Sequence, residues 1–189
     1  MKKFLLTWYG ITDFRASLGF ENTDGPIAGA LVGDAYTHVV ILGYTRSDDD
    51  PNELIEAQKT FAHELALIRD AGQDKDWKAT SQFVSRFDNT AVAHEHFEAW
   101  LKIKATTLGC DASIRLKSEK LSYLNDTEGI YAGAMRALGG VERESGEKFV
   151  TLYLSPGTPV MAFVWALAAL NYPELKKRLV ASSIVAKAP

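Results

Sequence analysis

Short apolar runs in this sequence alternate with longer stretches of helical periodicity, and this alternation limits the folds that the chain can adopt. The runs at 2–8, 37–45 and 148–154 are rich in β-branched and aromatic residues and are apolar almost throughout. Strands of this kind are covered on both faces, as they are in parallel sheets. The sequence therefore predicts an α/β protein with a Rossmann-like, mostly parallel sheet flanked by helices.

Weaker patterns complete this outline. Strands are also expected at 112–121 and 178–185, and helices at 26–36, 53–72, 88–109, 125–147 and 160–171. The candidate helix caps are Asp50 or Asn52, Asp88 or Asn89, and Asp126 or Thr127, and the candidate helix ends are Gly72, Gly109 and Gly146. Residues 11–25 are expected to form a long loop, whereas 73–87 show no clear pattern. We expect one domain over residues 1–189, with an added helical segment near 51–87.

The composition argues against several classes of protein. With a net charge of −3, the chain lacks the basic surface of proteins that coat duplex nucleic acid. The single cysteine, Cys110, excludes an internal disulfide and a CxxC zinc pair. The most apolar stretch, 160–170, is far short of the roughly 20 residues that cross a bilayer. We expect a cytoplasmic protein without a membrane partner, and the N-terminal part of a longer polypeptide.

Ligands of open parallel sheets bind beyond the carboxyl ends of the strands, so the segments that follow the strands carry the candidate site. Three such segments are rich in hydroxyl, amide, glycine or arginine groups: 7–17, 44–49 and 155–161. In the third, Gly157 permits a positive φ, Thr158 is a good N-cap and Pro159 suits the first helical position. The free amides at such a helix start favour an anion such as phosphate. The same three residues also suit a tight turn in a buried core, and both interpretations stay open.

Other motifs are absent or weak. No G-x-G-x-x-G follows the first strand, and there is neither a G-x-x-x-x-G-K-[ST] loop nor a G-x-S-x-G elbow. His94 and Glu98 have helical spacing, but no third metal ligand is evident, and Cys110 has no neighbouring base. Asp48–Asp50 is more typical of a solvated loop or a helix cap than of a cation site. We therefore assign no catalytic residue, metal or cofactor from the sequence.

Three phrases give the chain a family resemblance. "FLLTWYG" at the start, "NDTEGIYAGAMRAL" before the late strand and "VTLYLSPGTPVMAFVWALAAL" across the late turn resemble the CRISPR-associated Rossmann fold, or CARF, domain. The late turn also resembles that of the sensor domains of bacterial RNA-repair transcription activators, a branch of the same family. The segment 51–87 lies outside the resemblance, and Pro156 stands where many relatives have glycine, which removes one backbone donor.

The resemblance implies a ligand and a set of site residues. CARF domains bind cyclic oligoadenylates, the messengers of type III CRISPR antiviral defence, as homodimers with the ligand on the two-fold axis. It implies a cyclic tetra- or hexa-adenylate ligand here and allosteric control of a C-terminal effector domain outside this chain. Trp8 and Tyr9 are candidates for adenine stacking, and Arg15 and Arg46 for phosphate contact. The full set is Trp8, Tyr9, Gly10, Thr12, Asp13, Arg15, Ser17, Thr45, Arg46, Ser47, Ser155, Pro156, Gly157, Thr158, Pro159 and Met161.

Alternatives to each of these roles remain. Trp8 at a strand end is also typical of core packing, and either arginine is also typical of a solvated surface. A slow ring nuclease that opens the cyclic ligand and a sensor of RNA 2′,3′-cyclic phosphate ends are the alternative functions. A Rossmann-like module for another nucleotide is the least specific hypothesis.

Overall fold

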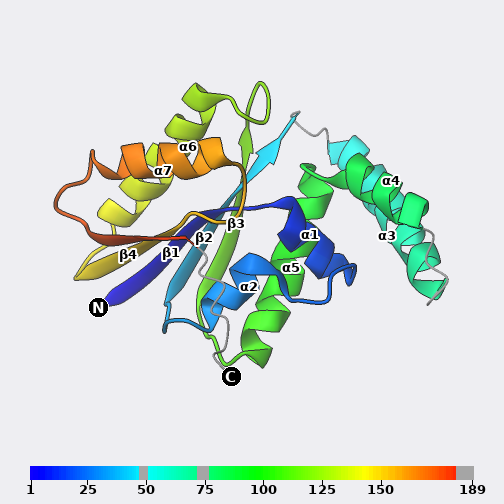
Figure 1. The fold of residues 1–189 in the computed structure, drawn as a ribbon, viewed down its shortest axis with the longest axis horizontal. Helices are drawn as coiled ribbons and strands as arrows, with labels where there is room; N and C mark the ends of the chain where they lie inside the picture. Colours follow the sequence, from blue (N-terminus) through cyan, green and yellow to red (C-terminus); the bar gives the residue numbers. More distant parts are fainter. Residues whose placement is uncertain (47–50, 72–76, 182–189) are drawn as a thin grey trace.

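The computed structural model describes residues 1–46, 51–71 and 77–181, which contain one sheet of five parallel strands in the order β3-β2-β1-β4-β5 (Figure 1). The strands are β1 (Lys2–Trp8), β2 (His38–Thr45), β3 (Ser113–Lys120), β4 (Lys148–Tyr153) and β5 (Lys176–Val180). The helices are α1 (Ile11–Leu18), α2 (Gly25–Leu31), α3 (Pro51–Asp70), α4 (Trp77–Phe87), α5 (Ala91–Thr107), α6 (Thr127–Glu142) and α7 (Pro159–Ala169). This arrangement confirms the predicted Rossmann-like α/β fold.

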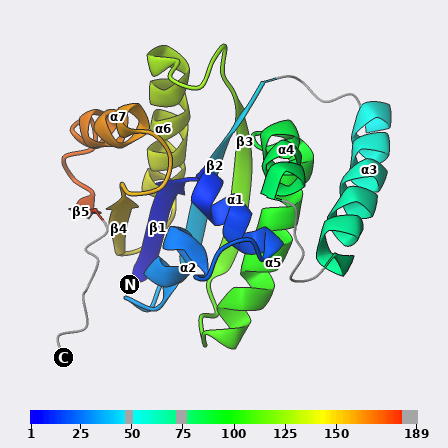
Figure 2. The same ribbon diagram turned by 45° about the vertical axis from the view of Figure 1, so that its right-hand side comes forward.

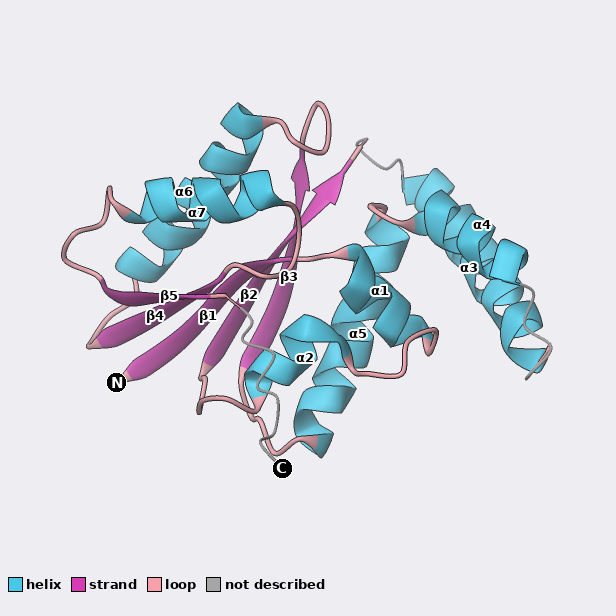
Figure 3. Ribbon diagram, in the orientation of Figure 1, coloured by secondary structure: helices cyan, strands magenta, loops and turns pink. Residues whose placement is uncertain are grey.

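Helices cover the sheet on both faces (Figure 3). α1, α2 and α5 lie on one face, and α6 and α7 lie on the other. Successive residues of β1 point to opposite faces, so Leu5 enters the first core and Leu6 enters the second. In the register of the sheet, Leu5 pairs with Val39 of β2 and with Thr151 of β4. This burial on both faces explains why the central strands are apolar almost throughout.

The added helical segment predicted near 51–87 is the pair α3 and α4, which packs beside α1 and α5 (Figure 2). An aromatic cluster holds the pair: the Phe61 ring lies 5.1 Å from the rings of Phe83 and Phe87, and Phe83 lies 4.8 Å from Phe87. Phe61 and Leu65, four residues apart on α3, are both buried. The burial of these large side chains is what orders a segment whose second half showed no clear sequence pattern.

One expectation about the backbone was wrong. The long loop expected at 11–25 begins instead with helix α1, so that only residues 19–24, between α1 and α2, are irregular. Phe14 and Leu18, four residues apart, are both buried, and Gly19 ends α1 with a φ of 79°. The Ser17 hydroxyl donates to the Phe14 carbonyl, so this buried polar side chain is satisfied within the helix. The apolar pair decided the structure, against the polar composition around it.

The helix caps are partly as expected. Asp126 caps α6 by accepting a hydrogen bond from the Gly129 amide at 3.0 Å, which confirms one candidate. α5 is capped by Thr90 rather than by Asp88 or Asn89, because Asn89 adopts a φ of 61° one residue earlier. Asn52 lies inside α3 rather than at its cap. α6 ends at Glu142, before Gly146.

The remaining boundary expectations fall at the limits of the described residues. Asp50, Gly72 and the end of the strand expected at 178–185 lie outside them, and β5 ends at Val180. The edge strand β3 is covered at one point by α5, because Glu98 accepts a hydrogen bond from the Leu116 amide at 2.9 Å. None of the helices in the described ranges combines the length and the apolar character that crossing a membrane requires.

Candidate functional site

The carboxyl ends of β1 and β4 lie side by side at the centre of the sheet, because these strands pair in parallel with Thr7 beside Tyr153. The chain leaves β1 into α1 on one face and leaves β4 into α7 on the other (Figure 1). In open parallel sheets, the point where connections diverge to opposite faces is the usual ligand position. The structure thus brings together two of the three segments predicted from the sequence. We call this place the β1–β4 junction, formed by residues 10–13 and 155–161.

Two glycines bring the backbones of the two turns into contact. A Cβ atom on Gly10 would stand 2.9 Å from the Gly157 nitrogen. A Cβ atom on Gly157 would stand 2.8 Å from Met161 Sδ and 3.0 Å from Trp8 Cβ, and Gly157 has a φ of 84°. Side chains at either position would push the turns apart, so the close approach of the two backbones requires glycine at both.

The late turn leads directly into the first turn of α7. The Thr158 hydroxyl oxygen accepts a hydrogen bond from the Met161 amide at 3.3 Å, and Pro159 takes the first helical position. The Thr158 amide donates to Met161 Sδ at 3.4 Å, which is a weak acceptor. Among the described residues, the amides of Gly157 and Val160 donate to no other backbone group. With the dipole of α7, these amides favour an anion at the junction.

Asp13 contributes a buried carboxyl group to the junction from the side of α1. Its side chain is 1% exposed, and its Oδ2 atom would be 3.5 Å from a Cβ on Gly10. Oδ1 accepts a hydrogen bond from the Ile27 amide at 2.9 Å, whereas Oδ2 has no hydrogen-bond partner in the described part of the chain. Burial raises the pKa of Asp13 to about 7, although the amides of Ile27 and Gly10 oppose the rise. A carboxyl that is partly protonated at neutral pH repels a nearby anion less than an ordinary aspartate does.

Several predicted ligand contacts are core residues in this structure. Trp8 and Met161 are each 1% exposed, Tyr9 is 4% exposed, and Ser17 and Pro156 are also buried. The rings of Trp8 and Tyr9 point to opposite faces of the sheet, and helices cover both faces. A ring without an open face has no room for a stacked base, so the stacking predicted for Trp8 and Tyr9 has to be corrected to core packing.

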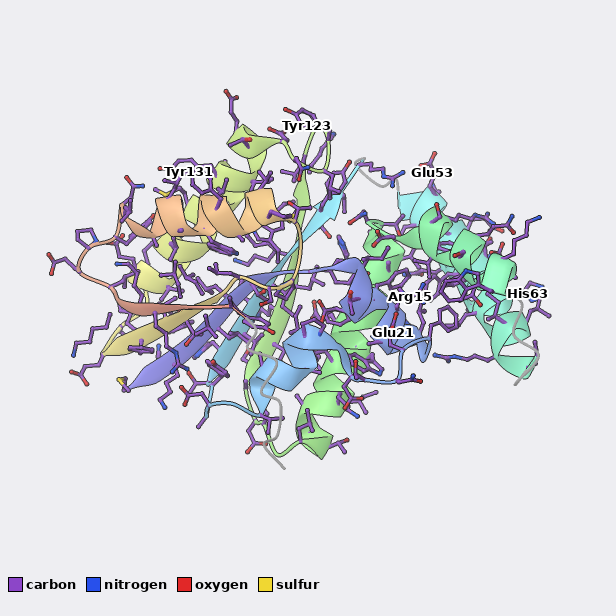
Figure 4. The ribbon with its side chains drawn as sticks, in the orientation of Figure 1. Arg15, Glu21, Glu53, His63, Tyr123 and Tyr131 are labelled. Carbon is purple, nitrogen blue, oxygen red and sulfur yellow. The ribbon has the colours of Figure 1, made fainter. Side chains whose placement is uncertain are left out.

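Arg15 and Thr12 lie on different sides of α1. The Arg15 guanidinium forms an ion pair with Glu21 and lies 5.1 Å over the Trp77 ring, so it is held by these partners toward α4 (Figure 4). The predicted phosphate contact of Arg15 is therefore not formed here. Thr12 is exposed and lines a groove of about 1080 Å³ between α2 and the strands β4 and β5. Ser155 and Pro159 are exposed at the junction itself.

The second predicted segment follows β2 and leads to a different neighbourhood. Thr45 is buried at the end of β2, and Arg46 is exposed. The charge of Arg46 acts on Asp88, the residue between α4 and α5, and lowers its pKa, although burial raises that pKa overall. Ser47 lies outside the described residues. The structure thus places Arg46 near Asp88 rather than in the contact between the two glycine turns.

Sequence reasoning missed a buried polar cluster next to this segment. His94 of α5 is 2% exposed, its Nδ1 shares a hydrogen bond with Ser118 Oγ at 2.8 Å, and burial lowers its pKa to about 4. Tyr9 meets the His94 ring edge-on at 5.0 Å, and the charges of Asp88 and Asp13 add to burial in raising the Tyr9 pKa.

Within the described residues, Tyr9 Oη, His94 Nε2 and one Asp88 oxygen have no hydrogen-bond partner. Buried groups of this kind are usually satisfied by water or a ligand. In the sequence, the one sign of this cluster is Gly43, a glycine within an apolar strand. The structure explains it, because a Cβ atom at position 43 would stand 2.5 Å from His94 Cε1.

Comparison with known proteins locates the fold. No protein-family description and no curated protein matches this chain. Among solved structures, one of Enterococcus italicus Csm6 bound to cyclic hexa-2′-fluoro-hexa-dAMP is similar, with a TM-score of 0.59 and 18% sequence identity. The match covers 100% of this chain and 35% of the Csm6 chain, so this chain spans about a third of that protein's length. At this identity the likeness concerns the fold alone, and it shows that the chain shares a Rossmann-like α/β fold with part of Csm6.

Proposed function

We propose that this chain is a sensor domain that binds a cyclic oligoadenylate at the β1–β4 junction, as a homodimer, and regulates an attached effector domain. The observation that carries the proposal is the convergence of two helix starts, those of α1 and α7, where the backbones of Gly10 and Gly157 meet. Both helices direct the positive ends of their dipoles toward this edge of the sheet. An oligoadenylate presents a phosphate for each nucleotide, and this place offers backbone donors to such a group.

Two further observations support this ligand class. The raised pKa of Asp13 limits the negative charge beside the bound phosphate. The similar solved structure contains a cyclic hexanucleotide analogue bound to Csm6, which is a statement about that protein. No described feature favours cleavage over binding, because the Thr158 hydroxyl is used as the cap of α7. The proposal is therefore binding, with ring cleavage and recognition of RNA ends as outcomes of the same experiment.

A charge reversal at an exposed position tests the site without disturbing the core. Pro159 is exposed at the first position of α7, so Pro159→Glu places a carboxylate where the phosphate is proposed to bind. A negative charge is tolerated at a helix start, so the fold should be retained. We expect cyclic tetra- or hexa-adenylate to bind the unchanged chain in isothermal titration calorimetry, and Pro159→Glu to weaken that binding at least tenfold.

The matched control is Ile103→Glu, which adds the same charge at a 72% exposed position of α5. It should bind as the unchanged chain does. Linear products in the titration mixture would indicate a ring nuclease, and binding of an RNA 2′,3′-cyclic phosphate alone would indicate an RNA-end sensor. The absence of binding to any cyclic oligoadenylate, or equal affinity of Pro159→Glu and Ile103→Glu, would contradict the proposed site.

A further inference from the structure

The sheet ends at β3, and no other strand of the described ranges pairs with the outer edge of this strand. Helix α5 runs beside that edge (Figure 2), and a groove of about 720 Å³ lies between the two. The groove is lined by the second half of α5, as far as Thr106, and by residues 110–117. An unpaired strand edge presents backbone N–H and C=O groups that pair readily with another chain.

Two hydrogen bonds show which backbone groups of β3 face the groove. The Ser113 amide donates to the Thr37 carbonyl at 2.9 Å, toward β2. The Leu116 amide donates to the Glu98 carboxylate of α5 at 2.9 Å, away from β2. Because the amides of successive strand residues point in opposite directions, the Ile114 amide faces the groove, as the Leu116 amide does. Glu98 occupies only the Leu116 amide, so the part of the edge that precedes it stays open to pairing.

The side chains of β3 along the groove form two rows. Ile114 and Leu116 point to the face covered by α5, where Ala105 also lines the groove. Arg115 and Lys117 point to the opposite face of the sheet. A strand added beside β3 would alternate in the same way. Every second side chain of that strand would therefore face α5, and the side chains between them would lie beside Arg115 and Lys117.

The charged side chains of the groove carry an excess of positive charge. Glu98 is already used, because it forms an ion pair with Lys102. Arg115 and Lys117 are exposed, and neither forms an ion pair within the described residues. Asp111 is the one remaining acid among the described residues that line the groove. The local charge is thus positive, although the chain as a whole has a net charge of −3.

We propose that the outer edge of β3 binds an extended acidic peptide by strand addition, and that apolar and acidic residues alternate in this peptide. Its backbone would pair with the edge, its apolar side chains would contact the α5 side of the groove, and its carboxylates would pair with Arg115 and Lys117. A second copy of the chain fits less well. Two β3 edges related by a two-fold axis would bring Arg115 and Lys117 of one copy beside the same cations of the other.

Fluorescence anisotropy with a labelled peptide tests the pattern. The probe alternates valine and glutamate over about six residues, the usual length of a strand. We expect the unchanged chain to bind it with a Kd in the micromolar range at low salt. A peptide of the same composition, with its valines and glutamates in two separate blocks, should bind at least tenfold more weakly. A peptide of alternating valine and lysine should not bind.

Variants of the chain test the position of the peptide. Lys117→Glu should weaken binding several-fold, whereas Lys176→Glu, the same change at an exposed lysine of the opposite edge strand β5, should not. Thr106→Trp fills the groove from an exposed position of α5 without a change of charge, and it should weaken binding at least tenfold. Its matched control is Ile103→Trp, because Ile103 is 72% exposed on the same helix and does not line the groove.

Amide hydrogen exchange measured by NMR tests strand addition itself. The peptide should slow exchange of the Ile114 amide at least tenfold and leave that of Arg115, which faces β2, unchanged. Absence of binding, equal affinity for the alternating and two-block peptides, or unchanged exchange at Ile114 would overturn the proposal. Slower exchange at Ile114 with rising protein concentration and no peptide would assign the edge to a second copy instead. None of these results depends on the ligand proposed at the β1–β4 junction.

Discussion

At the residue scale, two buried titratable side chains respond to pH in opposite directions. Burial raises the pKa of Asp13 to about 7 from its ordinary 3.8, so its ionisation costs the folded state stability as the pH rises between these values. Burial lowers the pKa of His94 to about 4 from 6.5, so its protonation costs the folded state stability as the pH falls across that range. Because the two ranges overlap, the two effects partly cancel in the unchanged protein.

Asp13→Asn isolates the carboxyl group. The amide keeps an oxygen for the Ile27 N–H but has no charge to bury. The free energy of unfolding of this variant, relative to the unchanged chain, should rise by about 3 kcal/mol from pH 5 to pH 8, as two pKa units imply. Urea unfolding at the two pH values measures it. Asp126→Asn is the matched control: amides of Gly129 and Ser122 lower the pKa of Asp126 below its ordinary 3.8, so this carboxyl is ionised throughout pH 5 to 8 and the relative stability of the variant should not change over that range. A relative stability of Asp13→Asn that does not change with pH would mean that the folded protein already holds Asp13 ionised at pH 5.

At the scale of the single element, the turn between β4 and α7 depends on two properties of glycine. One is its freedom to adopt a positive φ, and the other is the absence of a Cβ atom where space is short. Gly157 has a φ of 84° and also has Met161 Sδ and Trp8 Cβ within 3.0 Å of any added Cβ. Gly109, after α5, has a φ of 72° and nothing within 4 Å. Comparison of the two positions distinguishes the cost of the left-handed backbone from the cost of crowding.

Gly109→Ala should lower the free energy of unfolding by about 1 kcal/mol, the cost of a left-handed non-glycine residue. Gly157→Ala should lower it by a further 1–3 kcal/mol, roughly the cost of overpacking a core, because the methyl group meets Met161 Sδ and Trp8 Cβ. Urea unfolding of both variants measures the difference. Equal losses would show that the contact between the β1 and β4 turns is loose enough to accept a side chain.

At the scale of the whole molecule, the proposed function predicts the ratio of bound ligand to chain. If one ligand contacts the β1–β4 junctions of two chains, calorimetric titration with cyclic oligoadenylate should saturate at one ligand per two chains. Saturation at one ligand per chain would mean that each junction binds by itself.

The sequence by itself determined the class of the fold and the order of its strands and of the helices other than α1 and α4, because nearly continuous apolar strands and periodic helices can be buried together in few ways. It also determined the late turn, since Gly157, Thr158 and Pro159 act through local backbone preferences that need no distant partner. Local patterns failed where distant contacts outweighed composition. The pair Phe14 and Leu18 made α1 a helix, and the aromatic cluster of Phe61 ordered α4.

Tertiary structure alone decided which of the predicted site residues meet. Parallel pairing of β1 with β4 brought Gly10 to Gly157, whereas burial removed Trp8 and Tyr9 from any open surface and the contacts with Glu21 and Trp77 held Arg15 elsewhere. The clusters around Asp13 and His94 also emerged only in three dimensions. The physical reason is that backbone preference is a property of a few neighbouring residues, whereas burial, and the pKa and contacts that follow from it, depends on segments far apart in the chain.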